Sequence, residues 1–142
     1  MNDEFNFLND LTAEEIQTLS PLVFAYIGDA YFHLYVRTRL LKISHKINKL
    51  HELSAKIVSA VSQAKAYEKI EPNLTDEEKN FFRRGRNAKS HAPKNSTVAE
   101  YHASTGFETL LGELFLQKKF SRLDEICEMA FCALELNGEE NF

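Results

Sequence analysis

Two carboxylates, Asp29 and Glu108, stand inside stretches whose other residues predict buried helix, 22–35 and 105–116. We expect both acids on the packed sides of their helices, where an isolated carboxylate is expensive to remove from water. That cost is offset if the two helices meet and the acids share a divalent cation. Carboxylate oxygens are ligands that magnesium prefers, so the pair predicts a Mg²⁺ site formed by Asp29 and Glu108.

A glycine accompanies each acid. Gly28 directly precedes Asp29, and Gly112 lies one helical turn after Glu108. Glycine inside a helix costs about 1 kcal/mol relative to alanine, so both positions predict a close approach by another helix or a ligand. The alternative for the acids is structural, because hydrogen bonds or Lys and Arg partners can also satisfy buried carboxylates.

Two neighbouring residues are weaker candidates for the same chemistry. His33 lies one turn past Asp29 and could touch the site, although a core or interface role is the alternative. Glu113 follows Glu108 by five residues, which places it about 140° round the helix. We therefore expect Glu113 at the surface or at an interface, and not at the cation.

The densest run of basic residues comes just before the helix of Glu108. Phosphate contacts dominate the affinity of proteins for polyanions, so this run predicts a phosphate-binding segment. The alternative is a solvated helix end, where cations are favourable near the C-terminal dipole. The run contains Arg83, Arg84, Arg86, Lys89, His91 and Lys94, and a second group contains Arg37, Arg39, Lys42, Lys46 and Lys49.

The distribution of charge supports a polyanionic partner, although the net charge of −4 alone does not. Residues 1–20 hold five acids and no Lys or Arg, and residues 121–142 hold six acids and one Arg. Between them, residues 33–94 hold fourteen Lys or Arg and six acids, a local net charge of +8. A basic middle between acidic ends is typical of a chain that binds a polyanion.

Length and composition indicate one soluble globular domain. The 142 residues suffice for one core, and the apolar content of 44% is ordinary. We find no apolar run long enough to span a membrane and no signal peptide. Two cysteines, Cys127 and Cys132, make neither a disulfide framework nor a zinc site, so we expect a cytoplasmic protein.

The elements that must position these residues are all helices. The chain has only five glycines and three prolines, and apolar residues do not alternate with polar ones. The expected helices are a short one opened by the capping box Thr12–Glu15; 21 to about 41, opened by Ser20-Pro21; 47–70; one from the capping box Thr75–Glu78 to 86–87; 97–117, with a possible break at 104–106; and 121 to about 136.

Three segments carry a resemblance to a known family. They are Gly28-Asp29-Ala30 in an apolar helix, 107–112 (Phe-Glu-Thr-Leu-Leu-Gly) in a later one, and the basic stretch 81–89 between them. Over about residues 15–136, the chain resembles the catalytic domain of the ribonuclease III family. The form of the second motif, and a catalytic domain without a double-stranded-RNA-binding domain, resemble its Mini-ribonuclease III branch.

The resemblance implies an all-helical homodimer that cleaves both strands of double-stranded RNA with Mg²⁺, leaving 5′-phosphate and 3′-hydroxyl ends. It also implies a role in maturing the precursor of 23S ribosomal RNA. By position, Asp29 and Glu108 match the family's metal-binding acids, and the basic segment is assigned to RNA. Tyr26 matches the place where the family inserts an apolar side chain across the dimer interface.

The chain departs from the larger family members at two positions. Ala25 stands one turn before Asp29, and Thr105 stands three residues before Glu108, where those enzymes place acids. We expect Thr105 to orient a water or to accept a hydrogen bond beside the cation. The departures leave open a catalytically silent RNA-binding or ribosome-assembly module. A helical adaptor protein, in which the basic middle is incidental, is a third possibility.

Overall fold

The computed structural model describes residues 5–88, 91–92, 94 and 96–138, and these residues form helices and turns without a strand. The predicted all-α class is confirmed. In chain order the elements are η1 (Asn6–Asp10), α1 (Ala13–Gln17), α2 (Pro21–Leu40), α3 (Ile47–Ile57), α4 (Ala60–Ile70), η2 (Glu71–Asn73), α5 (Asp76–Arg86), α6 (Val98–Leu116) and α7 (Phe120–Gly138).

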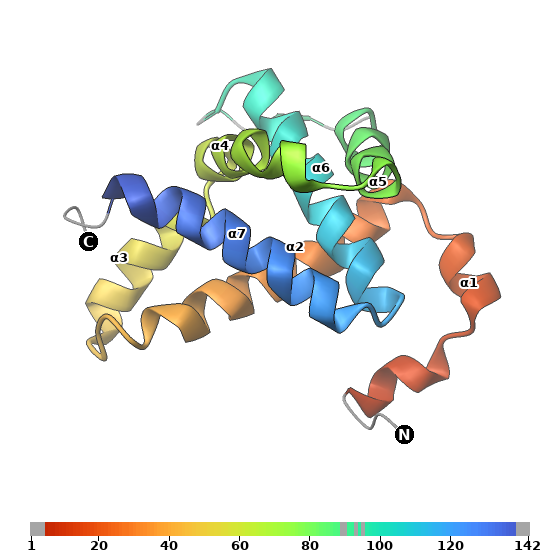
Figure 1. Ribbon diagram of the computed structural model, residues 1–142, viewed down its shortest axis with the longest axis horizontal. Coiled ribbons are helices and arrows are strands. Elements are labelled where there is room, and N and C mark those ends of the chain that lie inside the picture. The colour runs from red at the N-terminus through yellow and green to blue at the C-terminus, as the bar shows by residue number, and fades with distance from the viewer. Residues whose placement is uncertain (1–4, 89–90, 93, 95, 139–142) are drawn as a thin grey trace.

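Helix α6 is the centre of the fold. It packs against α2, α4, α5 and α7, and Figure 1 shows it passing between these helices. This position explains its composition, because a helix contacted on all sides must be apolar nearly all round. Its side chains Phe107, Leu110, Leu111 and Leu114 are buried in the core.

Glycines allow α2 and α6 to touch through their backbones. A Cβ atom on Gly28 would lie 1.8 Å from the Glu108 carbonyl oxygen, and one on Gly112 would lie 1.9 Å from the Phe24 carbonyl oxygen. Neither position can carry a side chain without moving the helices apart. The close approach that the sequence predicted at both glycines is therefore confirmed.

The predicted single helix over residues 47–70 is wrong. Helix α3 ends at Ile57, and Ser59 in extended conformation starts α4 by accepting a hydrogen bond from the Ser62 backbone N–H. The possible break at 104–106 is also absent, since α6 is continuous there. Gly106 serves packing instead, because a Cβ there would lie 2.7 Å from the Phe82 carbonyl oxygen.

Most helix starts that the sequence predicted are present. Thr12 and Glu15 form a capping box on α1, and Thr75 and Glu78 form another on α5. Helix α7 begins one residue earlier than expected, at Phe120.

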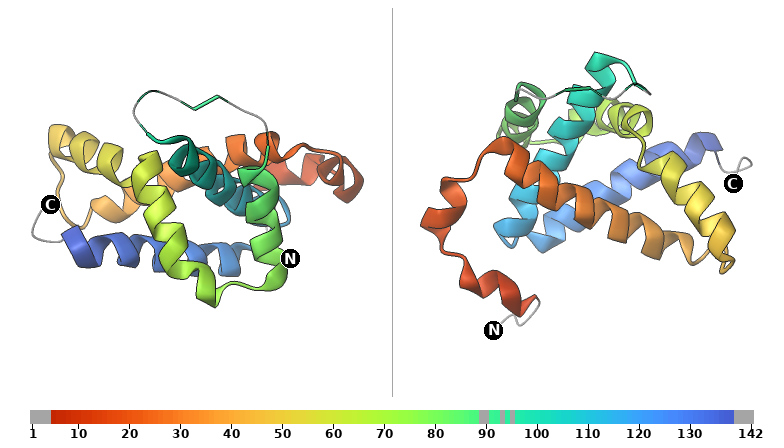
Figure 2. Two further views of the ribbon diagram at one scale, coloured as in Figure 1. Left: turned by 90° about the horizontal axis from the view of Figure 1, so that it is seen from above. Right: turned by 180° about the vertical axis from the view of Figure 1, so that it is seen from behind.

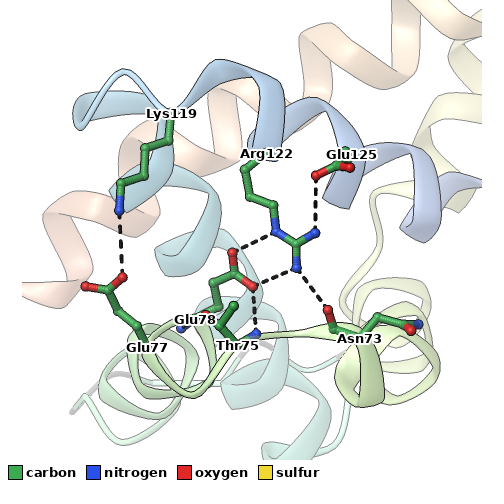
Figure 3. A network of polar contacts seen from close by, with 7 residues as sticks. All are labelled: Asn73, Thr75, Glu77, Glu78, Lys119, Arg122 and Glu125. Atoms are coloured by element: carbon green, nitrogen blue, oxygen red, sulfur yellow. Dashed lines mark hydrogen bonds and ion pairs between the residues drawn. The ribbon is translucent and has the colours of Figure 1, made fainter.

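A polar network fixes the start of α5 against α7 (Figure 3). The Arg122 guanidinium donates to both carboxylate oxygens of Glu78 and to the Asn73 carbonyl oxygen, at 2.8–2.9 Å. Glu78 also accepts from the Thr75 backbone N–H, so one buried carboxylate joins the cap to α7. This holds the helix that carries the basic segment.

Among the described residues, no helix covers the outer face of α2. Figure 2, seen from behind, shows α2 at the front of the molecule with the N-terminal segment extending to one side. Four large apolar side chains of α2 are exposed there, namely Leu22, Val23, Tyr26 and Leu34.

Two further observations concern the predicted environment of the chain. No helix within the described residues is long and apolar enough to cross a membrane. Both cysteines are free: Cys127 is buried in the core, and Cys132 is exposed on α7.

Candidate active site

Helices α2 and α6 bring Asp29 and Glu108 together. The backbone contact at Gly28 places Asp29 beside Glu108, where the Asp29 carboxyl raises the pKa of Glu108. The structure therefore joins two acids that are 79 residues apart in the sequence.

The two acids differ in exposure. Glu108 is partly buried, whereas the Asp29 side chain is 53% exposed. The expectation that both lie on packed sides is wrong for Asp29, because Gly28 and Phe32 form the packed face of α2 and Asp29 falls beside it. His33 does touch the site, since its Nε2 atom lies 3.2 Å from Asp29 Oδ1.

Gln63 of α4 is a site residue that the sequence did not reveal. Its side chain is 1% exposed, and Nε2 donates to Glu108 Oε2 at 3.0 Å. The sequence shows that Gln63 is a polar residue on the apolar face of α4. It does not show the contact with Glu108, because that contact depends on α4 crossing α6.

The pKa of Glu108 is shifted by these surroundings. Burial raises it first, and the adjacent Asp29 carboxyl raises it further, while the hydrogen bond from Gln63 lowers it. Together they raise the pKa of Glu108 from 4.5 to about 8. A buried acid beside another acid binds a proton readily, and a bound cation opposes that shift because it stabilises the charged carboxylate.

The side chains present at the site fit a hard divalent cation. Two carboxylates adjoin each other, and in the part of the chain that the structure describes no Lys or Arg pairs with either one. The described residues contain no group of three or more His, Cys, Asp and Glu side chains suited to a metal. Magnesium is commonly held by one or two carboxylates with several waters, so two acids are sufficient.

Ala25 and Thr105, the two departures from the larger family members, are both buried. The Thr105 hydroxyl donates to the Tyr101 carbonyl oxygen at 3.1 Å, within its own helix. Among the hydrogen bonds of the described residues, none joins Thr105 to Asp29 or Glu108. Its predicted place beside the cation stays a prediction.

The interpretation of Glu113 as a surface or interface residue is wrong. Glu113 is 3% exposed in the monomer and forms an ion pair with Arg84 of α5. Burial raises the pKa of Glu113, and the Arg84 guanidinium opposes that shift. The helix angle correctly separated Glu113 from Glu108, but it could not show that α5 covers this side of α6.

The remaining basic residues of the segment are accessible. Arg83, Arg86 and Lys94 are exposed, and the Arg86 guanidinium lies over the Phe82 ring at 5.7 Å. Arg84 is half-exposed, but its guanidinium forms an ion pair with Glu113. Arg84 therefore has an ion-pair partner among the described residues, unlike the exposed Arg83. Lys89 lies outside the described residues.

Comparison with known proteins identifies the family. The model of the family described as "Ribonuclease III domain" matches residues 22–119, which include both acids and the basic segment. The chain therefore belongs to the ribonuclease III family, and the enzyme class predicted from the sequence, an endoribonuclease, is confirmed.

The similar proteins place the chain in the Mini-ribonuclease III branch of this family. The chain is 44% identical over 127 residues to Mini-ribonuclease 3 of Thermoanaerobacter sp. (strain X514), covering 88% of this chain and 89% of that protein. It is 46% identical over 115 residues to Mini-ribonuclease 3 of Symbiobacterium thermophilum, covering 80% and 88%. A crystal structure of a Fusobacterium nucleatum protein superposes with a TM-score of 0.73 at 31% identity, covering 78% of this chain and 91% of that one.

Proposed function

We propose that this protein is an endoribonuclease that cuts double-stranded RNA, with Asp29 and Glu108 holding a catalytic Mg²⁺. The observation that carries the metal assignment is the pairing of two carboxylates, one partly buried, with no Lys or Arg among the described residues to neutralise them. Two adjacent negative charges are unfavourable in a folded protein unless a cation compensates them.

Each residue has a distinct part in this proposal. Asp29, exposed on α2, and Glu108, packed between α2 and α4, would bind the ion from two helices. A magnesium ion bound there would activate a water for attack on the phosphodiester and stabilise the departing 3′ oxygen. His33, in contact with Asp29, would limit the orientation of that carboxylate.

The basic segment would supply contacts to the RNA backbone. Proteins recognise double-stranded RNA mostly through its shape, phosphates and 2′-hydroxyls. Arg83, Arg86 and Lys94 are exposed near the end of α5 and in the connection to α6, the helix of Glu108. We extend this assignment to Lys89 from the sequence alone. The resemblance further suggests the 23S ribosomal RNA precursor as a substrate and the cytoplasm as the location.

A homodimer completes the proposal, because cutting both strands requires two sites. The exposed apolar face of α2 is continuous with an apolar cavity of about 260 Å³ that Phe5, Phe7, Tyr31 and Phe115 help to line. Tyr26 is 76% exposed on this face, where a second copy would cover it. C2 dimers are the commonest way to bury such a surface.

The test is cleavage of a long RNA duplex by the purified protein with Mg²⁺ and with EDTA. We expect Mg²⁺-dependent cutting, and we expect Asp29→Asn to reduce it by at least a hundredfold with the fold and duplex binding retained. Cleavage by Asp29→Asn within tenfold of wild type would contradict the metal assignment. Binding without cutting by the wild type would favour the catalytically silent module instead.

A further inference from the structure

Gln63 is buried at the junction of α4 and α6, and its amide has one favourable orientation. Nε2 donates to Glu108 Oε2 and to the Val58 carbonyl oxygen, both at 3.0 Å. Both partners can only accept while Glu108 is a carboxylate, so the amide nitrogen must face them with its two hydrogens. The amide oxygen is buried without a partner, and turning the amide over would place that oxygen against two other acceptors.

The break between α3 and α4 makes this orientation possible. In a continuous helix the Val58 carbonyl would accept from the Ser62 backbone N–H. Here that N–H donates to the Ser59 hydroxyl, which caps α4, and the Val58 carbonyl is free to bind the Gln63 side chain. The interruption of the helix therefore anchors the amide that contacts Glu108.

The choice of a neutral donor distinguishes this contact from a structural ion pair. A Lys or Arg would hold the Glu108 carboxylate at least as strongly, and the chain uses Arg in this way at Glu78 and at Glu113. At Glu108 such a charge would oppose a cation on the same carboxylate. An amide holds the carboxylate and leaves its charge uncompensated.

We propose that Gln63 is a positioning residue of the active site, whose amide holds the Glu108 carboxylate ready for a divalent cation without adding a competing positive charge. This inference rests on the proposed function, since it requires a cation at Asp29 and Glu108. Groups that orient metal ligands commonly affect metal affinity or activity by about 10–100-fold. Gln63 would act through Glu108 and need not touch the RNA.

The test compares Gln63→Met with Tyr67→Phe. Methionine keeps the length and apolar stem of Gln63 and removes its donor. Tyr67 lies one turn further on α4, is also buried, and has a hydroxyl without a partner, so its loss is a matched control. We expect Gln63→Met to bind Mn²⁺, measured by electron paramagnetic resonance, at least tenfold more weakly than wild type. Duplex RNA binding in EDTA should not change, and Tyr67→Phe should match wild type in both measurements.

The outcomes separate this inference from the proposed function. Mn²⁺ binding by Gln63→Met within threefold of wild type would overturn the inference and leave the proposed function intact. If wild type itself neither binds Mn²⁺ nor cuts RNA, the proposed function fails and this inference fails with it. If Gln63→Met does not fold, Gln63→Asn replaces it, because it keeps the amide but is one methylene too short to reach both oxygens. The same tenfold loss is then expected, and wild-type affinity would again overturn the inference.

Discussion

Asp29 and Glu108 both carry a carboxyl group, but their surroundings differ. This difference affects how readily Glu108 takes up a proton. Asp29 is half-exposed and reaches solvent, whereas Glu108 lies between helices with Gln63 as its neutral neighbour. Without a cation, Glu108 is therefore the acid that takes up a proton, because its charged form is the more poorly solvated.

This difference predicts how stability depends on pH in the absence of metal. The pKa of Glu108 is raised from 4.5 to about 8 in the folded state, so between these values the folded protein holds a proton that the unfolded chain has lost. The stabilisation from this group is complete below about pH 4.5 and is lost as pH rises towards 8. Mg²⁺ should restore stability at pH 8.

Substitution tests the source of this dependence. Glu108→Gln removes the titrating group and keeps its shape, so it should flatten the profile and raise Tm at pH 8 in EDTA by several degrees. Glu68→Gln, an exposed position on α4, is the control and should leave the profile unchanged. Thermal unfolding at pH 5, 6.5 and 8 is the measurement. Parallel profiles for wild type and Glu108→Gln would show that another group causes the dependence.

At the scale of elements, local signals predicted most of the helices. Capping boxes and Ser20-Pro21 act within a few residues, so the sequence reveals them directly. The break at Ser59 was missed because the apolar spacing continues across it, and a single serine is a weak signal. The proximity of Asp29 and Glu108 could be predicted because acids are rare in apolar helices, but the contacts of Gln63 and the Arg84–Glu113 pair depend on which helices meet.

The contact between α2 and α6 makes a sharp prediction. Gly28→Ala would place a methyl group 1.8 Å from the Glu108 carbonyl oxygen. This oxygen belongs to the backbone, so it cannot move away as the end of a flexible side chain could. We expect a loss of about 3 kcal/mol or more in the free energy of unfolding. Thr38→Ala, exposed on the same helix, should change it by less than about 0.5 kcal/mol. Urea unfolding measures the stability of both variants. If Gly28→Ala were as stable as Thr38→Ala, α2 and α6 would have to lie further apart than the structure shows.

The basic segment of α5 divides into two kinds of residue. Arg84 holds the buried Glu113 carboxylate, whereas Arg83 is exposed and has no ion pair among those of the described residues. Removing Arg84 leaves a buried charge without its partner, so Arg84→Ala should destabilise the protein by about 1–3 kcal/mol. Adding Glu113→Gln should recover part of that loss, as urea unfolding of the double variant would show.

Arg83 and Lys94 should instead affect RNA alone. Replacing both with alanine should leave stability unchanged and weaken duplex binding with little sequence preference. The slope of log affinity against log salt should fall by about one for each phosphate that the variant no longer neutralises. The same measurement on Arg37→Ala/Lys49→Ala is the comparison. An unchanged slope for Arg83→Ala/Lys94→Ala with a reduced slope for the comparison would move the RNA surface to the end of α2 and to α3.

At the scale of the whole molecule, α2 has one face that is buried against α6 and one apolar face that is exposed. One packs on α6 through Phe24, Gly28 and Phe32, and the other exposes apolar side chains beside an apolar cavity. Asp29 is half-exposed on α2, three residues after Tyr26. A second copy on the outer face would fix α2, and with it the position of Asp29.

This arrangement predicts a homodimer at micromolar concentration that depends on Tyr26. Tyr26→Asp introduces a charge at the centre of the exposed apolar face, so it should dissociate the dimer while the monomer stays folded, because this side chain is 76% exposed. Ile47→Asp is the matched control, since Ile47 is 63% exposed but lies at the start of α3. Light scattering should give twice the chain mass for wild type and Ile47→Asp, and the chain mass for Tyr26→Asp. Cutting of both strands should be lost with the dimer, because each subunit supplies one site. A monomeric wild type would refute the dimer and the paired cut together.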